Sequence, residues 1–303
     1  PARPRAWAGM ARVPPSSSRR TPRPRPPSRC ARSNDCPARA RASTPITTPS
    51  PRWRGMKTSS FSTTPRKVVA FQARRIAAQG GQHGAVIWAK SQTAGKGRMG
   101  RTWVSEEGNL FVSVLLKPQA ALSHFPELSF VASLAVVEAL ADMFDGAHKL
   151  TCKWPNDVLL DGKKLAGILL ETYPCETDGK TWIVVGVGVN VDSHPADVMF
   201  PATCLTEAGV ELVSAKIVLS RFIHHFIECY NEWENKGFAG IRKRWLKLAW
   251  GLKKQMSVQV GDDTISGAFK EIDATGHMVL ASKEGPVTIN AGDVLLAEQL
   301  AQL

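Results

Sequence analysis

The sequence lacks the cysteine patterns of metal-binding and redox proteins. Its six cysteines are scattered, with no Cys-x-x-Cys pair and no cysteine–histidine cluster at a metal-ligand spacing. This arrangement predicts reduced, structural thiols and no protein-held metal ion. A run of 18 apolar residues is also missing, so we expect no transmembrane helix, a soluble protein and no membrane partner.

Acidic residues are almost absent from the N-terminal segment. Residues 1–57 hold 14 of the 39 Lys and Arg residues but only one of the 26 acidic ones, so the rest of the chain is formally neutral. The Arg-, Pro- and Ser-rich composition of residues 1–60 predicts disorder. An organelle-targeting presequence and a wrongly assigned start of the coding sequence explain it about equally well. A nucleic-acid-binding arm is less favoured. The expected location is the cytoplasm, or a mitochondrion or plastid if the segment is a presequence.

Beyond this tail the sequence predicts an α+β fold. Apolar residues at helical spacing indicate helices over 73–79, 129–144 and 215–233. Strands are expected over 85–90, 110–116 and 182–189, with a hairpin turning at Asp161-Gly162. We predict a mixed-sheet domain over 61–250. From Met256 onward, short strands separated by Gly, Asp and Lys predict a small β-barrel over 251–303.

The first candidate site is a basic, glycine-rich loop over residues 92–103, with the sequence QTAGKGRMGRTW. Its glycines let backbone N–H groups approach an anion closely. Its interleaved lysine and arginines supply positive charge, and each arginine offers a planar fork for phosphate or carboxylate. The loop is not a Walker loop, because no Gly-Lys-Ser/Thr leads into a helix. A flexible, solvated basic loop is the alternative from composition alone.

The second candidate site is Lys153-Trp-Pro-Asn-Asp157 together with the hairpin that follows. Alternation along the second strand places Lys164 on the face of Ala166 and Ile168. A lysine on a strand that is apolar on both faces is costly unless an anion meets it. Either Lys164 faces a ligand carboxylate or phosphate, or it lies at an exposed strand end.

The third candidate site is Gly186-Val-Gly188-Val-Asn190, at the end of an apolar strand. Two glycines on one face of a central strand indicate close approach of a ligand or of other backbone. Tight packing under a helix explains the pattern equally well.

Together these stretches resemble the biotin protein ligases, which include the holocarboxylase synthetases. The Lys-Leu-Ala-Gly-Ile-Leu strand and Pro201-Ala-Thr-Cys-Leu205, close to the family's Pro-Ala-Thr-Ser-Leu, strengthen the resemblance. It extends from about residue 73 to the C-terminus and implies a catalytic domain followed by an SH3-like β-barrel. A lipoate–protein ligase is the alternative. A repressor with an N-terminal helix-turn-helix domain is not expected, because residues 1–57 show no helical periodicity.

The resemblance also implies an activity and its participants. The enzyme would use ATP with Mg²⁺ to convert biotin to biotinyl-5′-AMP. It would then transfer biotin to a lysine of the biotin carboxyl carrier domain of a carboxylase. The resemblance does not decide whether the protein forms a homodimer.

The resemblance assigns a role to most residues of the candidate sites. Lys164, Arg98 and Lys153 would be catalytic, with Lys164 near the biotin carboxylate. Trp103 would pack at the adenine, and Asp157 would lie near the acceptor lysine or the metal. The full set expected to bind biotin or the adenylate is Gln92, Gly95, Lys96, Gly97, Arg98, Arg101, Trp103, Asn156, Asp157, Lys164 and Asn190.

One family element is missing from its expected place. The biotin protein ligases carry a Ser-Thr-Asn element before the first helix, where this chain has Val68-Val69-Ala70. Ser62-Thr63-Thr64 has a similar composition but lies about six residues too early. Either the helix is extended, or the sequence diverges upstream of Phe71; divergence is the favoured explanation.

Overall fold

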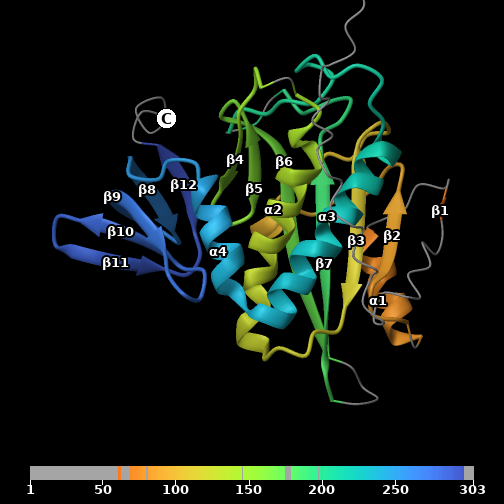
Figure 1. Ribbon diagram of the computed structural model, residues 1–303, viewed down its shortest axis with the longest axis horizontal. Coiled ribbons are helices and arrows are strands. Elements are labelled where there is room, and N and C mark those ends of the chain that lie inside the picture. The colour runs from red at the N-terminus through yellow and green to blue at the C-terminus, as the bar shows by residue number, and fades with distance from the viewer. Residues whose placement is uncertain are drawn as a thin grey trace, which may run out of the picture. The chain divides into compact units, whose positions relative to one another are not determined.

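The computed structural model describes residues 61–62, 69–79, 81–144, 146–174, 179–196, 198 and 200–296. The tail predicted for 1–60 lies outside these residues, as does Thr63. The described part contains a seven-stranded sheet and a five-stranded sheet (Figure 1).

The seven-stranded sheet is mixed, as predicted. Its strands follow the order β1 (Phe61–Ser62), β2 (Ala85–Ala89), β3 (Leu110–Leu116), β7 (Thr181–Val189), β6 (Lys163–Pro174), β5 (Asp157–Leu160) and β4 (Leu150–Lys153). β1 pairs with β2 in parallel, and the other neighbours are antiparallel. β7 lies between β3 and β6, which explains why its sequence is apolar on both faces.

The β5–β6 hairpin turns at the predicted dipeptide. Asp161 and Gly162 both have positive φ, 50° and 82°, as a two-residue type I′ turn requires. The pairing then shifts, so that Lys164 faces Leu159 while Ala166 faces Val158. This bulge places Lys164 beside Gly167, where an added Cβ would lie 3.4 Å from Lys164 Cε. The prediction that Lys164 shares the face of Ala166 and Ile168 is therefore wrong, because simple alternation does not survive a bulge.

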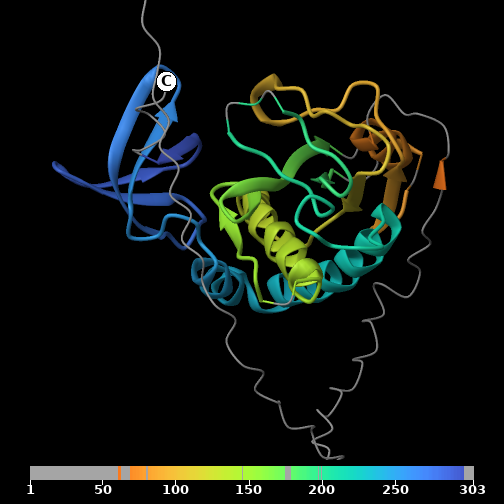
Figure 2. The same cartoon turned by 90° about the horizontal axis from the view of Figure 1, so that it is seen from above.

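Three helices lie together on one side of this sheet (Figure 2). They are α2 (Leu128–Ala141), α3 (Ala215–Lys236) and α4 (Phe238–Lys247). The predicted apolar stripe of α3 is buried: Leu219, Phe222, Phe226, Tyr230 and Trp233. α2 is buried almost all round, apart from Glu138 and its last residue, Ala141, because α3, α4 and the sheet surround it. The helical spacing of apolar residues over 129–144 predicts one apolar face packed on a core, and this prediction is wrong for that reason.

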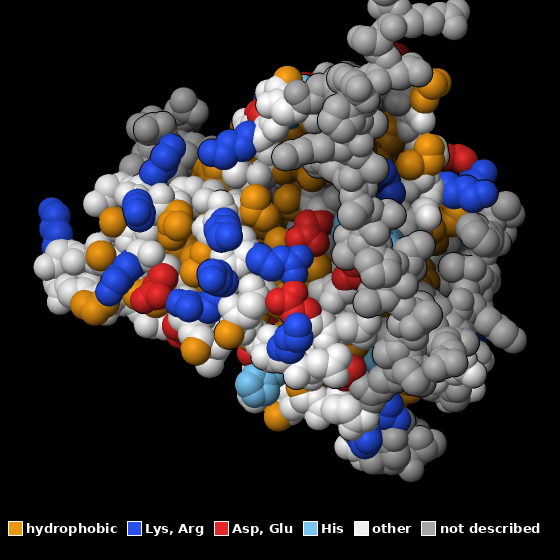
Figure 3. Space-filling model, viewed as in Figure 1, with side chains coloured by type: hydrophobic (Ala, Val, Ile, Leu, Met, Phe, Trp, Pro, Cys, Tyr) orange, Lys and Arg blue, Asp and Glu red, His pale blue; other side chains and the backbone are white. Residues whose placement is uncertain are grey.

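The burial of α2 also explains its high hydropathy. The segment Leu122–Ala141 is long and apolar enough to span a membrane by length and composition, but 78% of its most apolar window is buried inside the protein. Figure 3 shows acidic and basic side chains mixed on the face that covers it. Arg244 joins two acidic residues there, Glu138 of α2 and Glu232 of α3.

The opposite side of the sheet carries α1 (Val69–Ala78), and we call it the α1 face. Val69 and Ala73 pack there with Phe111, Leu115 and Val184. The helix begins four residues before the predicted start at 73. Two of the three residues at the position expected for Ser-Thr-Asn, Val69 and Ala70, therefore belong to the helix. This favours the explanation that the helix is extended.

The five-stranded sheet contains all five of the strands predicted after Met256. Its order is β11 (Gly285–Ile289), β10 (Met278–Ser282), β9 (Asp263–Ile272), β8 (Gln255–Val260) and β12 (Asp293–Leu296). Every neighbouring pair is antiparallel. This sheet is consistent with an SH3-like domain. The domain boundaries at 60 and 250 stay predictions.

Candidate functional site

A cavity of about 580 Å³ opens on the α1 face, beside the glycine-rich loop. This volume is in the range of small-molecule sites. Residues of β3, β7 and β6 that pair with one another form the floor of the cavity. Gly188 pairs with both Phe111 and Gly167, and Gly186 pairs with Ser113. All five residues line the cavity. The sheet therefore presents a floor with few side chains, next to a loop rich in cations.

The strand glycines make room for Trp103. A Cβ on Gly188 would lie 2.7 Å from the indole of Trp103, and a Cβ on Gly167 would lie 2.8 Å from it. Gly186 is less restricted, since its nearest neighbour would be Leu169 O at 3.3 Å. Neither explanation of the glycine pair describes Gly188: the group that approaches it closely is the side chain of Trp103, not a ligand, other backbone or a helix. The Trp103 indole nitrogen is buried and has no hydrogen-bond partner among the described residues, so a bound ligand could accept from it.

We expect Gly188→Ala to weaken ATP binding by displacing the Trp103 ring. Overpacking of this kind costs about 1–3 kcal/mol, so the KM for ATP should rise by roughly tenfold to a hundredfold. Steady-state kinetics with ATP and biotin varied separately test this. The KM for biotin should change less, because Trp103 is predicted to lie at the adenine.

Gly186→Ala is the matched control, because it adds the same methyl group two residues away on the same face of β7. Its contact with Leu169 O is tight but does not involve Trp103. Equal effects of the two substitutions on the KM for ATP would contradict the role of Trp103.

The glycine-rich loop closes on itself through its backbone. Gly97 N donates to Arg101 O (2.7 Å), and Trp103 N donates to Gly95 O (3.0 Å). Met99 adopts a positive φ of 53° within a short 3₁₀ turn, η2 (Arg98–Gly100). A Cβ on Gly95 would lie 2.3 Å from Trp103 O. Gly95 is thus required for the loop's own conformation, and it does not line the cavity.

Both arginines of the loop reach the C-terminal sheet. Arg98 Nη1 donates to Asn156 Oδ1 (3.2 Å) and more weakly to Gly292 O (3.4 Å). Arg101 Nη2 lies 2.9 Å from Asp293 Oδ1. Burial lowers the pKa of Arg98, and the carboxylates of Asp293 and Asp157 oppose that shift. The loop therefore connects the two sheets at the cavity.

Two lysines, one on β4 and one on β6, face the cavity. Lys164 Nζ lies 2.7 Å from Asp157 Oδ1 and 5.4 Å from the centre of the Trp103 ring. The anion that offsets the cost of placing Lys164 on this strand is the carboxylate of Asp157, a group of the protein itself. Lys153 is buried, and its Nζ lies 4.1 Å from the centre of the Phe200 ring, a favourable cation–π geometry.

Lys153 has a lowered pKa, so its charge changes close to neutral pH. Burial lowers the pKa of Lys153 to about 8; Asp157 opposes the shift and Lys164 adds to it. The ammonium is therefore charged below about pH 8 and neutral above it. We expect kcat/KM for ATP to fall above this pH, because kcat/KM reports groups of the free enzyme.

The pH profile of Lys153→Met checks this assignment. The variant should be slower at pH 7 and should lose the decline that the wild type shows above about pH 8. A decline of the same size in the variant would assign it to another group.

The side chains of two asparagines and a glutamine form hydrogen bonds with backbone groups around the cavity. Asn156 Nδ2 donates to Ile168 O (2.7 Å). Asn190 Nδ2 donates to Thr203 O (3.0 Å). Gln92 Oε1 accepts from Val69 N (2.9 Å) and so ties the loop to the start of α1.

The cavity gathers nearly all the residues that the sequence predicted. Those that line it are Gln92, Lys96, Gly97, Arg98, Arg101, Trp103, Lys153, Asn156, Asp157, Lys164 and Asn190. Val69, Ala70, Phe200, Gln259 and Asp293 also line it but were not predicted. Gln259 and Asp293 come from a separate sheet, and no local sequence signal marks them as cavity residues.

Comparison with known proteins identifies the family. Residues 62–190 match the sequence model of the Biotin/lipoate A/B protein ligase family. The chain is 34% identical over 213 residues to the biotin–[acetyl-CoA-carboxylase] ligase of Paracoccus denitrificans, covering 69% of this chain and 88% of that protein. The chain belongs to the biotin protein ligase family. It is also 33% identical to the bifunctional ligase/repressor BirA of Bacillus subtilis over 74% of this chain and 70% of that protein.

Solved structures of the family share the fold. The biotin protein ligase of Aquifex aeolicus in complex with biotin and ATP has a TM-score of 0.67 and 26% identity, covering 78% of this chain and 97% of that one. The family expected from the sequence motifs is thus confirmed. A biotin ligase is better supported than a lipoate ligase, because these relatives are named for biotin.

Proposed function

We propose that this biotin protein ligase activates biotin with ATP and transfers it to a lysine of a biotin carboxyl carrier domain. The observation that carries the proposal is the convergence of Arg98, Lys153 and Lys164 on one cavity with an apolar floor. Biotin has an apolar chain and ring system ending in a carboxylate, and ATP is a polyanion. The cavity offers both kinds of surface.

The first step joins two anions. A biotin carboxylate oxygen attacks the α-phosphorus of ATP, the bond to the β-phosphate oxygen breaks, and pyrophosphate leaves. Cations fixed beforehand stabilise the charge that develops in the transition state. Lys164 pairs with Asp157 at the cavity wall, and Lys153 lines the same cavity from β4. Mg²⁺ accompanies ATP as part of the substrate.

The second step uses the mixed anhydride. The neutral amine of the acceptor lysine attacks the acyl carbon, AMP leaves, and the nitrogen loses a proton. The adenylate must be shielded from water until then. The glycine-rich loop is suited to this role, because it borders the cavity and its tip is exposed: Met99 is 74% exposed.

Pyrophosphate exchange tests the proposal. Incorporation of labelled pyrophosphate into ATP should require biotin and should not occur with lipoate. A purified carrier domain should then acquire biotin on one lysine, as seen by mass spectrometry. Exchange with lipoate and not with biotin would replace the proposal with the alternative ligase.

A further inference from the structure

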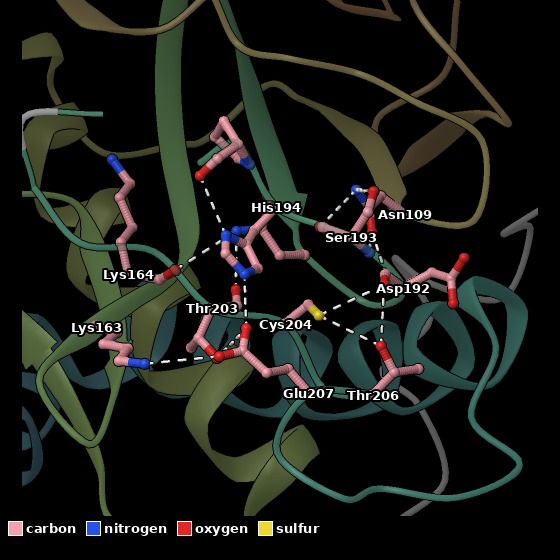
Figure 4. Close-up of polar contacts among 12 residues, drawn as sticks. Asn109, Lys163, Lys164, Asp192, Ser193, His194, Thr203, Cys204, Thr206 and Glu207 are labelled. Carbon is pink, nitrogen blue, oxygen red and sulfur yellow. Dashed lines mark hydrogen bonds and ion pairs between the residues drawn. The ribbon is translucent and has the colours of Figure 1, made fainter. Parts of the chain in front are cut away.

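Two loops beside the cavity bring together a histidine, a cysteine and a glutamate. We name them the His194 loop (residues 190–196) and the Cys204 loop (residues 200–207). One ligand atom each from His194, Cys204 and Glu207 lies within 4.8 Å of the others (Figure 4). The sequence does not reveal this group, since its members stand 10 and 3 residues apart and only the fold of both loops joins them.

The three side chains offer the donors that zinc prefers. Imidazole nitrogen, thiolate sulfur and carboxylate oxygen are its usual ligands, and three protein ligands leave a fourth position for water. The mixture of a soft sulfur with imidazole favours a thiophilic transition metal over Mg²⁺ or Ca²⁺. Mg²⁺ bound to ATP would therefore not compete well for this group.

The histidine is oriented as a metal ligand would be. Its Nδ1 lies 3.1 Å from Pro195 O, and its Nε2 lies 2.6 Å from Glu207 Oε2. Donation from Nδ1 to the backbone carbonyl leaves Nε2 to act as the ligand once the metal replaces the hydrogen bond between Nε2 and Glu207 Oε2. Such a hydrogen bond from the other ring nitrogen is the usual support of metal-bound histidine.

The glutamate is held from two sides and is open to solvent. Its Oε1 lies 3.6 Å from Lys163 Nζ, and Thr203 Oγ1 donates to Oε2 (3.4 Å). Oε2 can bind a cation while Oε1 keeps its contact with the lysine. The Glu207 side chain is 45% exposed, so an ion can enter from solvent.

The cysteine needs only a local rotation. Cys204 is buried, and its Sγ lies 3.4 Å from Asp192 O and 3.3 Å from Thr206 Oγ1. Figure 4 shows the sulfur on the Asp192 side of the group. The sulfur lies within 4.8 Å of a ligand atom of His194 and of Glu207, so the proposed site requires rotation about the Cα–Cβ bond to bring it to bonding distance. The thiol proton is released when the metal binds.

The Cys204 loop runs along β6, the strand that carries Lys164. Lys164 N donates to Pro201 O (2.7 Å), and Thr203 N donates to Lys164 O (3.0 Å). Pro195 and Ala202, one from each loop, line the cavity. We propose that His194, Cys204 and Glu207 bind one thiophilic divalent cation, Zn²⁺ being the best match, which ties the His194 loop to the Cys204 loop along the cavity wall.

Cobalt and zinc titrations test this proposal. The protein background carries Cys30→Ser, Cys36→Ser and Cys175→Ser, so that these three thiols cannot bind the probe. Burial raises the pKa of the Cys152 and Cys229 thiols to about 12, which keeps them protonated. We expect one equivalent of Co²⁺ to bind with a sulfur-to-cobalt charge-transfer band, and Zn²⁺ to displace it and raise the Tm.

Substitutions at two of the three ligands should have different effects. Cys204→Ser keeps a group that can bond to Asp192 O and should abolish the charge-transfer band. Glu207→Gln, at an exposed position, should weaken Zn²⁺ binding by about tenfold or more. Circular dichroism confirms that each variant is folded.

The matched control is the double variant His224→Asn, His225→Asn. These histidines lie near Glu228 on α3, 3.7 Å from it in each case. His225 also shares a contact with the buried Cys229, because both lie near Glu138 Oε2, but burial keeps that thiol protonated. The control should keep the charge-transfer band and full zinc affinity. The proposal is overturned if Cys204→Ser keeps the band, or if wild-type and Glu207→Gln proteins bind Zn²⁺ equally.

Discussion

Replacing Lys164 with alanine is expected to slow biotinyl-adenylate formation by about 10²–10³-fold. The reason is the loss of a cation that the β6 bulge directs into the cavity, 2.7 Å from Asp157. Biotin-dependent pyrophosphate exchange measures the effect. Near-normal exchange in the folded variant would remove Lys164 from the catalytic role.

The neighbouring lysine provides the control. Lys163→Ala removes an equal charge one residue away, but this side chain is 51% exposed and pairs with Glu207. Its exchange rate should stay close to that of the wild type. A second comparison separates the loss of the Lys164 cation from the effect of leaving the Asp157 carboxylate without its partner. Adding Asp157→Asn to Lys164→Ala removes the carboxylate left alone, and the rate should stay low if the cation itself is needed.

Replacing Arg98 with glycine should have the second large effect, early release of the adenylate. Arg98 links the glycine-rich loop to Asn156 and to the C-terminal sheet, and its guanidinium fork can grip a phosphate. Glycine offers neither interaction. Free biotinyl-5′-AMP should leave the enzyme faster and biotinylate bystander lysines of an added protein such as albumin.

Two measurements define this result. The first is the dissociation rate of preformed adenylate, and the second is streptavidin detection of biotin on albumin. Arg98→Lys keeps a positive charge without the fork and should give an intermediate release rate. If Arg98→Gly biotinylates only the carrier domain, Arg98 does not retain the adenylate.

Local sequence patterns were sufficient to predict most elements of the fold. The Asp161-Gly162 turn, the buried stripe of α3 and the five strands after Met256 follow from local rules. Positive φ at a turn, helical spacing and strand alternation depend on neighbouring residues only. The start of α1 was placed too late, because Val69 and Ala70 are held by packing against the sheet and not by a local signal.

The order of the motifs alone indicated the family, and nearly all the residues predicted from the motifs line the cavity. Their arrangement in space was decided by the tertiary structure. The β6 bulge sets the face of Lys164, and the register of β3, β7 and β6 places Gly188 and Gly167 under Trp103. Asp293 reaches Arg101 across 192 residues, and His194 meets Glu207 through the fold of two loops. The contacts of Trp103 with Gly167 and Gly188 and of Arg101 with Asp293 join residues far apart in the sequence, so they depend on strand pairing and packing that local patterns do not contain.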